Sequence, residues 1–366
     1  MEAMNLLFTR FPLESIPGGG AETQTISLMR GLRDHGHTVK FAGSCPALLQ
    51  AALHSQFSIL NFQLGPPPVT KWLALSFLWR APFMRKKLST LLAAFDSKLE
   101  AIVMLSLTEK LLLTDLAVRR GIKVFWIEHD RIGPWLTYSP WLWLLRRQSE
   151  LATTITVSEL SRKKYLELGW SREGTVAIPN GVAMSDKRIA NSTHASHDLP
   201  LPATHSQLHI GCVSRLSKEK GVDLLIEAVK DMPDVKLTIV GKGKLCHHDT
   251  NIIPFVEDIT SFYHGIDLLV LPSRDHDPFG LVAAEAMMCG IPVIVTNQCG
   301  IAGYLKDGVD AVVVKAGSSE ALRIAIERCK MQETRDKLSI EGAKTAKQLF
   351  TVDRMIQTYE KLFLQS

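Results

Sequence analysis

Two carboxylates, Asp277 and Glu285, are the residues in this chain whose spacing most directly suggests chemistry. The first falls where an apolar run turns into a helix, and the second lies about two helical turns further on, so both can face one crevice. Three residues between them would present free backbone N–H groups at a helix N-terminus, where a phosphate is favoured: Phe279, Gly280 and Leu281. This layout suits a nucleotide sugar. The simpler alternative is an ordinary strand–helix unit in which Glu285 is a solvated helix residue.

Two cations follow an earlier apolar run, at Arg215 and Lys220. Arginine supplies a planar fork of donors and lysine a mobile point charge, and together they suit a pyrophosphate group. The alternative for Lys220 is a solvated turn, the more common place for a run of charges. Gly241 follows another apolar run, where a glycine-rich turn leaves room for a base or a ribose.

The first half of the chain offers a glycine-rich loop and a histidine. Gly19 and Gly20 follow the first apolar run and precede Glu22 and a helical stretch, so backbone and helix N-terminus can both approach a ligand. The loop is not G-x-G-x-x-G, so a dinucleotide fingerprint is not supported, and by itself it is equally consistent with a flexible turn. His129 lies just past an apolar strand, at the sheet edge that faces ligands. It is a candidate for contact with a ligand; the alternative is a capped structural histidine.

These residues need a scaffold of parallel strands. Apolar runs of strand length alternate with helical stretches, at residues 5–9, 38–42, 101–107, 123–128 and 153–157 and again at 208–213, 236–240, 252–255, 266–272, 292–296 and 311–314. The alternation predicts an α/β protein with two Rossmann-like, doubly wound domains that face a central crevice.

The domain limits follow from composition. A polar stretch separates the two series of strands, so we expect an N-terminal domain at residues 1–185, a linker at 186–207 and a C-terminal domain at 208–350. The tail at 351–366 has helical apolar spacing, and we expect it to pack back on the first domain.

Composition narrows the class of protein. The net charge of +5 with 22% charged residues is mildly basic, and no signature of an RNA- or DNA-binding module appears, so we expect no nucleic-acid partner. Six cysteines lack disulfide or metal spacing, and the N-terminus lacks a signal-peptide pattern. We expect a cytoplasmic protein.

Two aromatic stretches flanked by basic residues indicate a surface for a membrane or an acceptor. One contains Trp72 and Trp79, and the other contains Trp141 and Trp143. Tryptophan beside lysine or arginine favours the lipid headgroup boundary, and neither stretch has the roughly 20 apolar residues of a spanning helix. Peripheral contact with the inner face of a membrane is one interpretation; a hydrophobic core or an acceptor pocket is the other.

Taken together, the residues from Asp277 through Glu285 to Val293 resemble the acid-x7-acid motif of the retaining glycosyltransferases of family 4, the GT-B type glycosyl transferases of group 1. The resemblance extends to Arg215 with Lys220, to the Val-Gly-x-Gly turn at Gly241, to the loop before Glu22 and to His129. It differs at two positions, because the usual first Glu is Asp277 and a later Glu is Gly303.

The resemblance implies a role for each motif. Asp277 would bind hydroxyls of the donor sugar, Glu285 the ribose, and His129 a group near the transferred sugar, whereas the loop before Glu22 would lie near the donor phosphates and the acceptor. The reaction would be sugar transfer from a nucleotide diphosphate sugar to a glycan, lipid-linked or other envelope acceptor, retaining and independent of metal. Arg215 and Lys220 would neutralise the leaving pyrophosphate.

Three alternatives remain open at this level. Asp275-His276-Asp277 has the letters of an Asp-x-Asp metal site. A sugar-nucleotide epimerase with similar domains would share the crevice and the glycines. A catalytically lapsed module that binds a nucleotide sugar or a membrane would tolerate the changes at Asp277 and Gly303.

Overall fold

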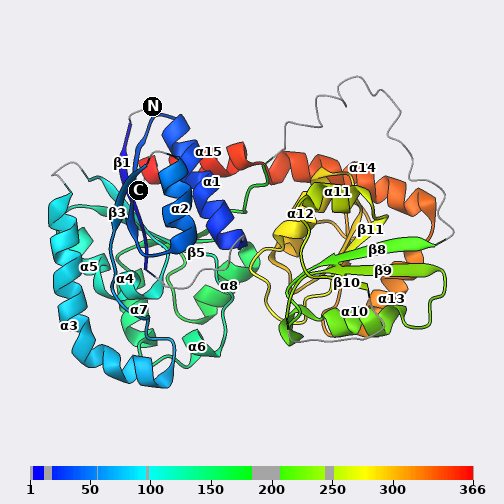
Figure 1. The fold of residues 1–366 in the computed structure, drawn as a ribbon, viewed down its shortest axis with the longest axis horizontal. Helices are drawn as coiled ribbons and strands as arrows, with labels where there is room; N and C mark the ends of the chain where they lie inside the picture. The colour runs from blue at the N-terminus through cyan, green and yellow to red at the C-terminus, as the bar shows by residue number, and fades with distance from the viewer. Residues whose placement is uncertain are drawn as a thin grey trace. The chain divides into compact units, whose positions relative to one another are not determined.

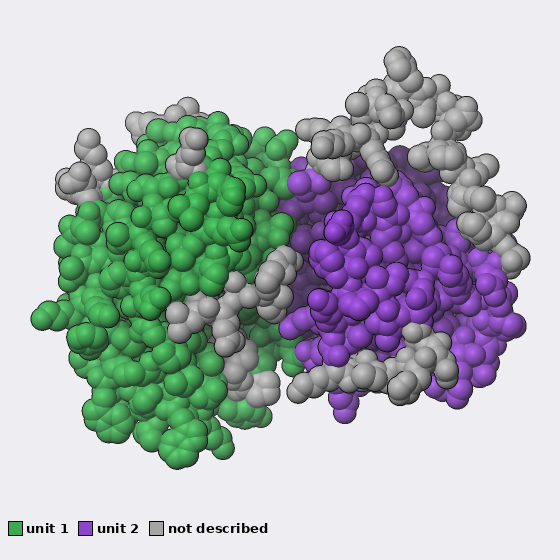
Figure 2. Space-filling view, viewed as in Figure 1, with its two compact units in different colours: residues 1–178, 352–366 green, residues 179–351 purple. Residues whose placement is uncertain are grey.

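The computed structural model describes residues 3–11, 19–55, 57–95, 99–183, 207–243 and 251–365. Two compact units make up the chain, which Figure 2 shows in different colours: unit 1 is residues 1–178 with 352–366, and unit 2 is residues 179–351. The boundary after Ile178 comes earlier than the expected residue 185. The expected linker at 186–207 lies outside the described residues except for Gln207.

Unit 1 is built on a seven-stranded parallel sheet with the strand order β3-β2-β1-β4-β5-β6-β7 (Figure 1). Its strands are β1 (Asn5–Arg10), β2 (Thr38–Gly43), β3 (Ser58–Asn61), β4 (Ala101–Met104), β5 (Lys123–Glu128), β6 (Thr153–Thr156) and β7 (Thr175–Ala177). The chain winds outward from β1 in one direction and from β4 in the other. The sheet therefore has a topological switch point between β1 and β4, where ligands of such sheets bind beyond the carboxyl ends of the strands.

Helices cover both faces of this sheet because its strands are apolar on both faces. In β1, Leu6 and Phe8 enter one hydrophobic cluster while Leu7 enters the other. The helices of the first face are α1 (Gly20–Asp34), α2 (Pro46–His54) and α15 (Val352–Gln365). Those of the second face include α3 (Lys71–Ala94), α4 (Leu107–Leu112), α5 (Thr114–Val118), α7 (Leu142–Ser149) and α8 (Glu159–Glu167), and a short helix α6 (Pro134–Thr137) precedes α7.

The C-terminal helix α15 packs within unit 1, against α1 and the sheet. A Cβ atom added at Gly31 would lie 1.9 Å from Cδ1 of Ile356, so the two helices meet where α1 has no side chain. The carboxylate of Glu360 is 3.0 Å from a ring nitrogen of both His35 and His37. Burial alone would raise the pKa of Glu360, but the contacts with the two histidines outweigh it and lower that pKa.

Unit 2 repeats the design with a six-stranded parallel sheet of order β10-β9-β8-β11-β12-β13. The strands are β8 (Leu208–Val213), β9 (Val235–Val240), β10 (Asn251–Ile253), β11 (Leu268–Leu271), β12 (Val293–Thr296) and β13 (Val312–Val314). The helices are η1 (Lys218–Lys220), α10 (Val222–Val229), α11 (Ile259–His264), α12 (Leu281–Met288), η2 (Gly300–Tyr304), α13 (Ser319–Arg328) and α14 (Gln332–Leu349). Its switch point lies between β8 and β11.

The prediction of two doubly wound α/β domains is confirmed, and most expected strands lie within a few residues of the observed ones. Two strands of unit 1 were not predicted, β3 and β7, which form the two edges of its sheet. The expected strand at 101–107 ends at Met104, because Ser106 begins the capping box of α4. Among the described helices, none combines the length and the apolar composition that crossing a membrane would need.

Candidate functional site

The carboxyl edge of the sheet in unit 2 brings the predicted cations and acids toward its switch point. Arg215 follows β8 by two residues, and Asp277 lies in the loop after β11, the neighbouring strand. Since parallel strands end at the same edge, both residues lie at the position where α/β sheets bind ligands. Two chain segments far apart in sequence thus converge within one unit.

A glycine makes that convergence possible. Gly221 has a φ of 67°, and a Cβ atom there would lie 2.1 Å from the carbonyl oxygen of Pro272, just after β11. The turn before it is tied to the same loop, because the backbone N–H groups of Arg274 and Asp275 donate to the carbonyl oxygen of Glu219. Only glycine allows this approach and this backbone conformation, so it sets where Lys220 points.

Lys220 and Asp277 form an ion pair at this point, with 2.7 Å between Nζ and Oδ2. The hydroxyl of Ser273 also donates to Oδ2, at 3.1 Å. The backbone of Asp277 is fixed as well: its N–H donates to Gln298 and its carbonyl oxygen accepts from Gly300. Asp277 is buried, and its carboxylate is therefore held in one place by a cation and a hydroxyl.

Phe279, Gly280 and Leu281 lead into α12 as expected. Phe279 is buried and its ring packs edge-on against Phe350, 5.5 Å between centroids. Gly280 adopts a φ of 92° and is the residue before the helix. Within the described part of the chain, the N–H groups of these three residues have no acceptor. What they offer a ligand is the positive end of a helix.

Glu285 lies in the middle of α12 and is held by a residue that sequence reasoning missed. The hydroxyl of Tyr263, on α11, donates to Oε2 of Glu285 at 2.7 Å. Burial raises the pKa of Glu285, and the hydrogen bond from Tyr263 partly offsets this. Tyr263 is itself buried, and in the sequence it reads as an ordinary core residue. No hydrogen bond joins Glu285 to Asp277 among the residues that the structure describes.

Arg215 and Gly241 also lie at the carboxyl edge of the unit 2 sheet. Arg215 is exposed, and its guanidinium makes no ion pair with any described residue. Gly241 follows β9 with a φ of 153°, and a Cβ atom there would lie 1.8 Å from the carbonyl oxygen of Ser214. The passage of the β8 loop over this position is sufficient to explain the glycine.

At the corresponding edge of the sheet in unit 1, two charged side chains form a buried ion pair. Glu22, in the first turn of α1, is bonded to Arg10 at the end of β1, 2.8 Å between oxygen and nitrogen, and both side chains are about one-tenth exposed. Gly19 is the residue before α1 and Gly20 begins it, whereas Gly18 lies outside the described residues. The carboxylate of Glu22 is thus engaged within the protein.

His129 directly follows β5 and is half-buried. Burial, together with the charges of Arg10 and Lys110, lowers its pKa to about 3, so the imidazole is neutral at physiological pH. Its neighbour Glu128 is used elsewhere, in an ion pair with Lys110 at 2.9 Å and a hydrogen bond from Tyr165. In the described residues neither Glu128 nor Asp130 bonds to the imidazole, so neither orients it directly.

A second buried acid lies near this edge and was not predicted. Glu109, in the first turn of α4, accepts hydrogen bonds from the backbone N–H and the hydroxyl of Ser106, and that hydroxyl also accepts from the N–H of Phe11 after β1. Glu109 is completely buried, which raises its pKa to about 7. The Ser-x-x-Glu spacing of a capping box was the available sequence signal.

The four tryptophans assigned to an acceptor or membrane side differ in environment. Trp72 and Trp79 on α3 and Trp143 on α7 are exposed. Trp141 instead packs edge-on against Phe77 at 5.1 Å, and its indole N–H donates to the carbonyl oxygen of Ala74. Trp141 therefore attaches α7 to α3 and is only partly exposed.

Packing does not explain why Gly303 stands where the family resemblance implies a Glu. This residue is in η2, and a Cβ atom there would meet nothing within 4 Å. A larger side chain would therefore fit in unit 2 at this position. As for a metal, the described residues contain no group of three or more His, Cys, Asp or Glu side chains placed to hold one.

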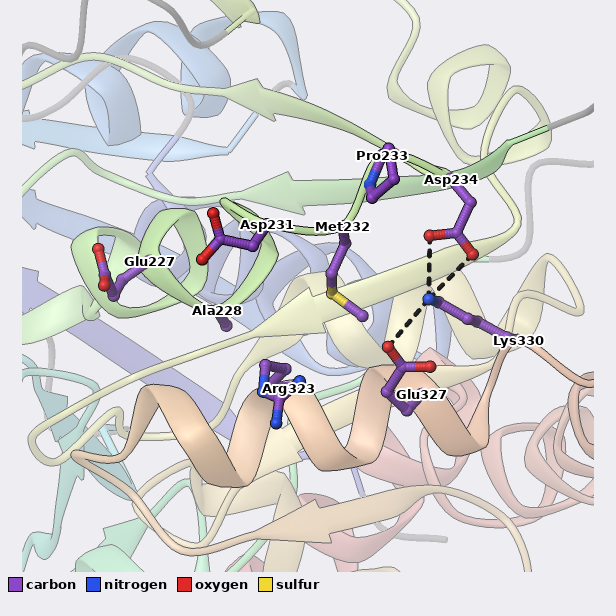
Figure 3. Close-up of a pocket in the computed structure, with 9 residues that line it drawn as sticks. All are labelled: Glu227, Ala228, Asp231, Met232, Pro233, Asp234, Arg323, Glu327 and Lys330. Carbon is purple, nitrogen blue, oxygen red and sulfur yellow. Dashed lines mark hydrogen bonds and ion pairs between the residues drawn. The ribbon is translucent and has the colours of Figure 1, made fainter.

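A groove elsewhere in unit 2 is unrelated to this edge (Figure 3). It lies between α10 and α13, near Asp234, which immediately precedes β9 at the edge where the strands begin. Lys330 closes one end of it by ion pairs with Asp234 and Glu327 (Figure 3). None of the predicted site residues lines it.

Two protein-family models match the chain, one over each half. The model described as Glycosyltransferase Family 4 matches residues 18–186, and the model described as Glycosyl transferases group 1 matches residues 200–345. Together the two models match most of the chain, one in each unit.

Curated relatives include two enzymes with named roles. The lipopolysaccharide core biosynthesis glycosyltransferase LpsE of Rhizobium meliloti (strain 1021) is 28% identical over 213 residues, 55% of this chain and 60% of LpsE. The capsular polysaccharide biosynthesis glycosyltransferase CapM of Staphylococcus aureus is 24% identical over 249 residues, 61% of this chain and 64% of CapM. The chain thus spans less than two thirds of either relative.

Solved structures agree on the fold. The crystal structure of HepE from Anabaena in complex with UDP superposes with a TM-score of 0.78 at 20% identity, covering 99% of this chain and 100% of HepE. At this identity the likeness establishes the architecture, two Rossmann-like domains of the GT-B type, and assigns no ligand to this chain.

Proposed function

The chain belongs to the family 4 glycosyltransferases, and from this premise we propose that it transfers a sugar from a nucleotide diphosphate sugar to a glycan, lipid-linked or other envelope acceptor. The observation that carries the proposal is the arrangement at the switch point of unit 2. There Lys220 is fixed against Asp277 and Arg215 is exposed. Among the residues that the structure describes, Arg215 has no ion-pair partner and the N–H groups at the start of α12 have no acceptor. Such a set of donors favours the diphosphate of a donor.

Each site residue takes a role in this proposal. Asp277 binds hydroxyls of the donor sugar, and Glu285 accepts from the ribose. Arg215 and Lys220 stabilise the charge that develops on the leaving diphosphate. His129, neutral because of its lowered pKa, exchanges hydrogen bonds with the transferred sugar.

We further propose that the transfer needs no metal ion and retains the anomeric configuration. Lys220 and Ser273 both contact Oδ2 of Asp277, so the charge of this carboxylate is already matched by a cation and a second cation at Asp275 and Asp277 would be repelled by Lys220. The lysine supplies positive charge where a metal would otherwise supply it. Retention rests on the family resemblance.

Relatives suggest the chemical class of donor and acceptor. HepE was crystallised with UDP, and LpsE and CapM are named for lipopolysaccharide core and capsular polysaccharide biosynthesis. We propose a UDP-sugar donor and an acceptor of the cell envelope, met at the cytoplasmic face of a membrane. Thermal-shift measurements with UDP-, GDP- and ADP-sugars test the base, because a ligand that binds only the folded state raises its stability.

The test of the proposed function is UDP release from UDP-glucose with and without EDTA. We expect turnover to persist in EDTA and to fall about 100-fold in Arg215→Ala, since one donor to the developing charge is lost. The control is Lys337→Ala, which removes an exposed cation from α14 of the same unit. A requirement for Mg²⁺ or Mn²⁺ would overturn the metal-independent mechanism.

A second candidate function is favoured by one observation. Gly303 stands where the family resemblance implies a Glu, and there is room for a side chain, so the contact that such a Glu would make with a donor is absent. A catalytically lapsed module that only binds a nucleotide sugar fits this feature. Binding of UDP-sugars without UDP release in any acceptor preparation would select it. Gly303→Glu would then be expected to strengthen donor binding without distorting η2.

A further inference from the structure

The outward face of α3 is apolar where a surface helix is normally polar. The helix has two apolar stripes: Phe77, Met84 and Leu88 are buried against unit 1, whereas Trp72 and Trp79 are 82% and 74% exposed. In Figure 1, α3 runs along the outer side of the unit 1 sheet. The exposed apolar residues of this 24-residue helix are therefore not explained by the folding of unit 1.

The exposed residues fall on a single face. Trp72, Leu75, Trp79 and Phe83 follow one another at spacings of three or four residues, the helical repeat, and all are at least half exposed. We call these four residues the α3 outer stripe. It extends over about 17 Å of helix at 1.5 Å per residue.

The charges around the stripe have one sign. Between Lys71 and Ala94 the sequence contains no Asp or Glu. Of its basic residues, Arg85 is paired with Asp115 and Arg80 donates to backbone carbonyls, but Lys71, Lys86 and Lys87 are exposed and make no ion pair among the described residues. Lys87 lies 5.0 Å from the centre of the Phe83 ring, so cation and aromatic group are side by side.

We propose that the α3 outer stripe, with Lys86 and Lys87, docks this protein on an anionic lipid bilayer. Tryptophan rings favour the headgroup boundary, and lysines beside them are attracted to anionic headgroups. The buried stripe of α3 stays in the core of unit 1 while the outer stripe enters the interface. This deepens the proposed function by naming the surface on which a lipid-linked acceptor is met, and it depends on that function only for the acceptor.

The arrangement favours lipid over a protein partner or a second copy of the chain. A protein interface of this composition would require a complementary acidic and apolar surface. The residues of α3 itself supply no acid, so a second α3 would bring like charges together. A bilayer containing anionic lipid supplies the apolar layer and the negative charge at once.

The experiment measures co-sedimentation of the full chain with vesicles of phosphatidylcholine mixed with phosphatidylglycerol, and with phosphatidylcholine alone. We expect binding to the anionic vesicles that weakens as salt is raised. Lys86→Gln with Lys87→Gln should lower partitioning roughly 10- to 30-fold, given the attraction of each cation to an anionic surface. Trp79→Ala with Phe83→Ala should lower it at least tenfold, because the interfacial aromatic anchors are removed.

The matched control changes exposed apolar and lysine side chains on α14. Ile340, Lys337 and Lys347 are exposed there, and Ile340→Ala with Lys337→Gln and Lys347→Gln should leave partitioning unchanged. Quenching of tryptophan fluorescence by brominated lipid should fall in Trp72→Phe with Trp79→Phe. All variants change exposed groups, and an unchanged far-UV circular dichroism melt confirms that each is folded.

Three outcomes would overturn the proposal. The first is that the protein does not bind anionic vesicles. The second is that the α14 control loses as much binding as the α3 variants. The third is that an α3 variant changes the oligomeric state but not the binding to vesicles. UDP release from UDP-glucose is measured in parallel on each variant. Because soluble donor turnover does not need the membrane, loss of vesicle binding with normal turnover separates this inference from the proposed function.

Discussion

At the switch point of each sheet a cation meets a carboxylate, but the two pairs leave different groups available. In unit 1, Arg10 and Glu22 are both nearly buried and the adjoining Lys110 is paired with Glu128. In unit 2, Lys220 and Asp277 are paired beside the exposed Arg215. Unit 1 therefore offers the neutral imidazole of His129, whereas unit 2 offers an excess of positive charge.

The difference between the two ion pairs shows how one fold can offer two kinds of binding site. Both sheets end in loops at the same topological point, so the architecture alone does not distinguish them. The balance of charge distinguishes them. A sheet edge whose charged side chains are paired suits the uncharged hydroxyl groups of a sugar, whereas an edge with an unpaired cation suits a diphosphate. Each variant below removes one element of this contrast.

Removing the cation of unit 2 should have the largest effect. In Lys220→Ala the donor loses a phosphate contact and Asp277 is left buried without its cation. We expect kcat/KM to fall about 1,000-fold, as for loss of a preorganised charge partner. The free energy of unfolding should fall by about 3 kcal/mol, because the pair is mostly removed from solvent. UDP release measures kcat/KM, and urea unfolding followed by circular dichroism measures the free energy of unfolding.

Lys218→Ala is the matched control for that variant. Lys218 lies on the same short helix η1 but is exposed, and no ion pair to its side chain occurs among the described residues. Its activity and stability should equal those of the unchanged protein. Equal losses in Lys218→Ala and Lys220→Ala would mean that η1, and not the Lys220–Asp277 pair, is what matters.

The buried acid of unit 1 should make stability depend on pH. Below about pH 4.5 Glu109 is protonated in both states; as pH rises to about 7 it ionises only in the unfolded chain, so the free energy of unfolding falls. Above that pH the loss is complete, about 3 kcal/mol. Glu109→Gln keeps the cap and should flatten this dependence.

Tryptophan fluorescence is a suitable measurement, because all seven tryptophans fall in unit 1. Urea unfolding is followed across the window from pH 4.5 to 7 that Glu109 defines. Glu150→Gln, at an exposed position of the same unit, is the control and should retain the pH dependence. A Glu109→Gln curve parallel to that of the unchanged protein would show that another group is responsible.

The neutral histidine of unit 1 comes next in expected effect. His129→Ala should lower kcat about 100-fold if the imidazole contacts the reacting sugar, with little change in stability because the side chain is only half-buried. Its pKa of about 3 means that His129 adds no protonation step to the rate between pH 5 and 8. NMR titration of the ring should show a neutral imidazole across that range, and a midpoint near 6 would contradict this. His54→Ala, at an exposed helix end, should have normal activity.

The sequence sufficed for the fold because buried parallel strands are continuous apolar runs. It did not reveal β3 and β7, since β3 is partly exposed and the Thr-Val-Ala of β7 is not a continuous apolar run. The pairing of Lys220 with Asp277 was also not predictable, because it depends on Gly221 packing against the end of β11, a contact between distant segments. The partners Ser273 and Tyr263 have side chains common in any core or turn, so only the folded geometry distinguishes them.

The smallest expected effect tests whether Glu285 needs its own partner in unit 2. Tyr263→Phe keeps the buried ring but removes the hydroxyl that donates to Glu285. Because that bond stabilises the carboxylate, its loss should raise the pKa of Glu285 further, and the acid limb of the rate profile should move to higher pH. We expect KM for the donor to rise about tenfold while kcat stays within about twofold, as for a positioning residue that acts through a binding group. A parallel fall in kcat, or an unshifted acid limb, would mean that Tyr263 serves only the packing of α11 on α12.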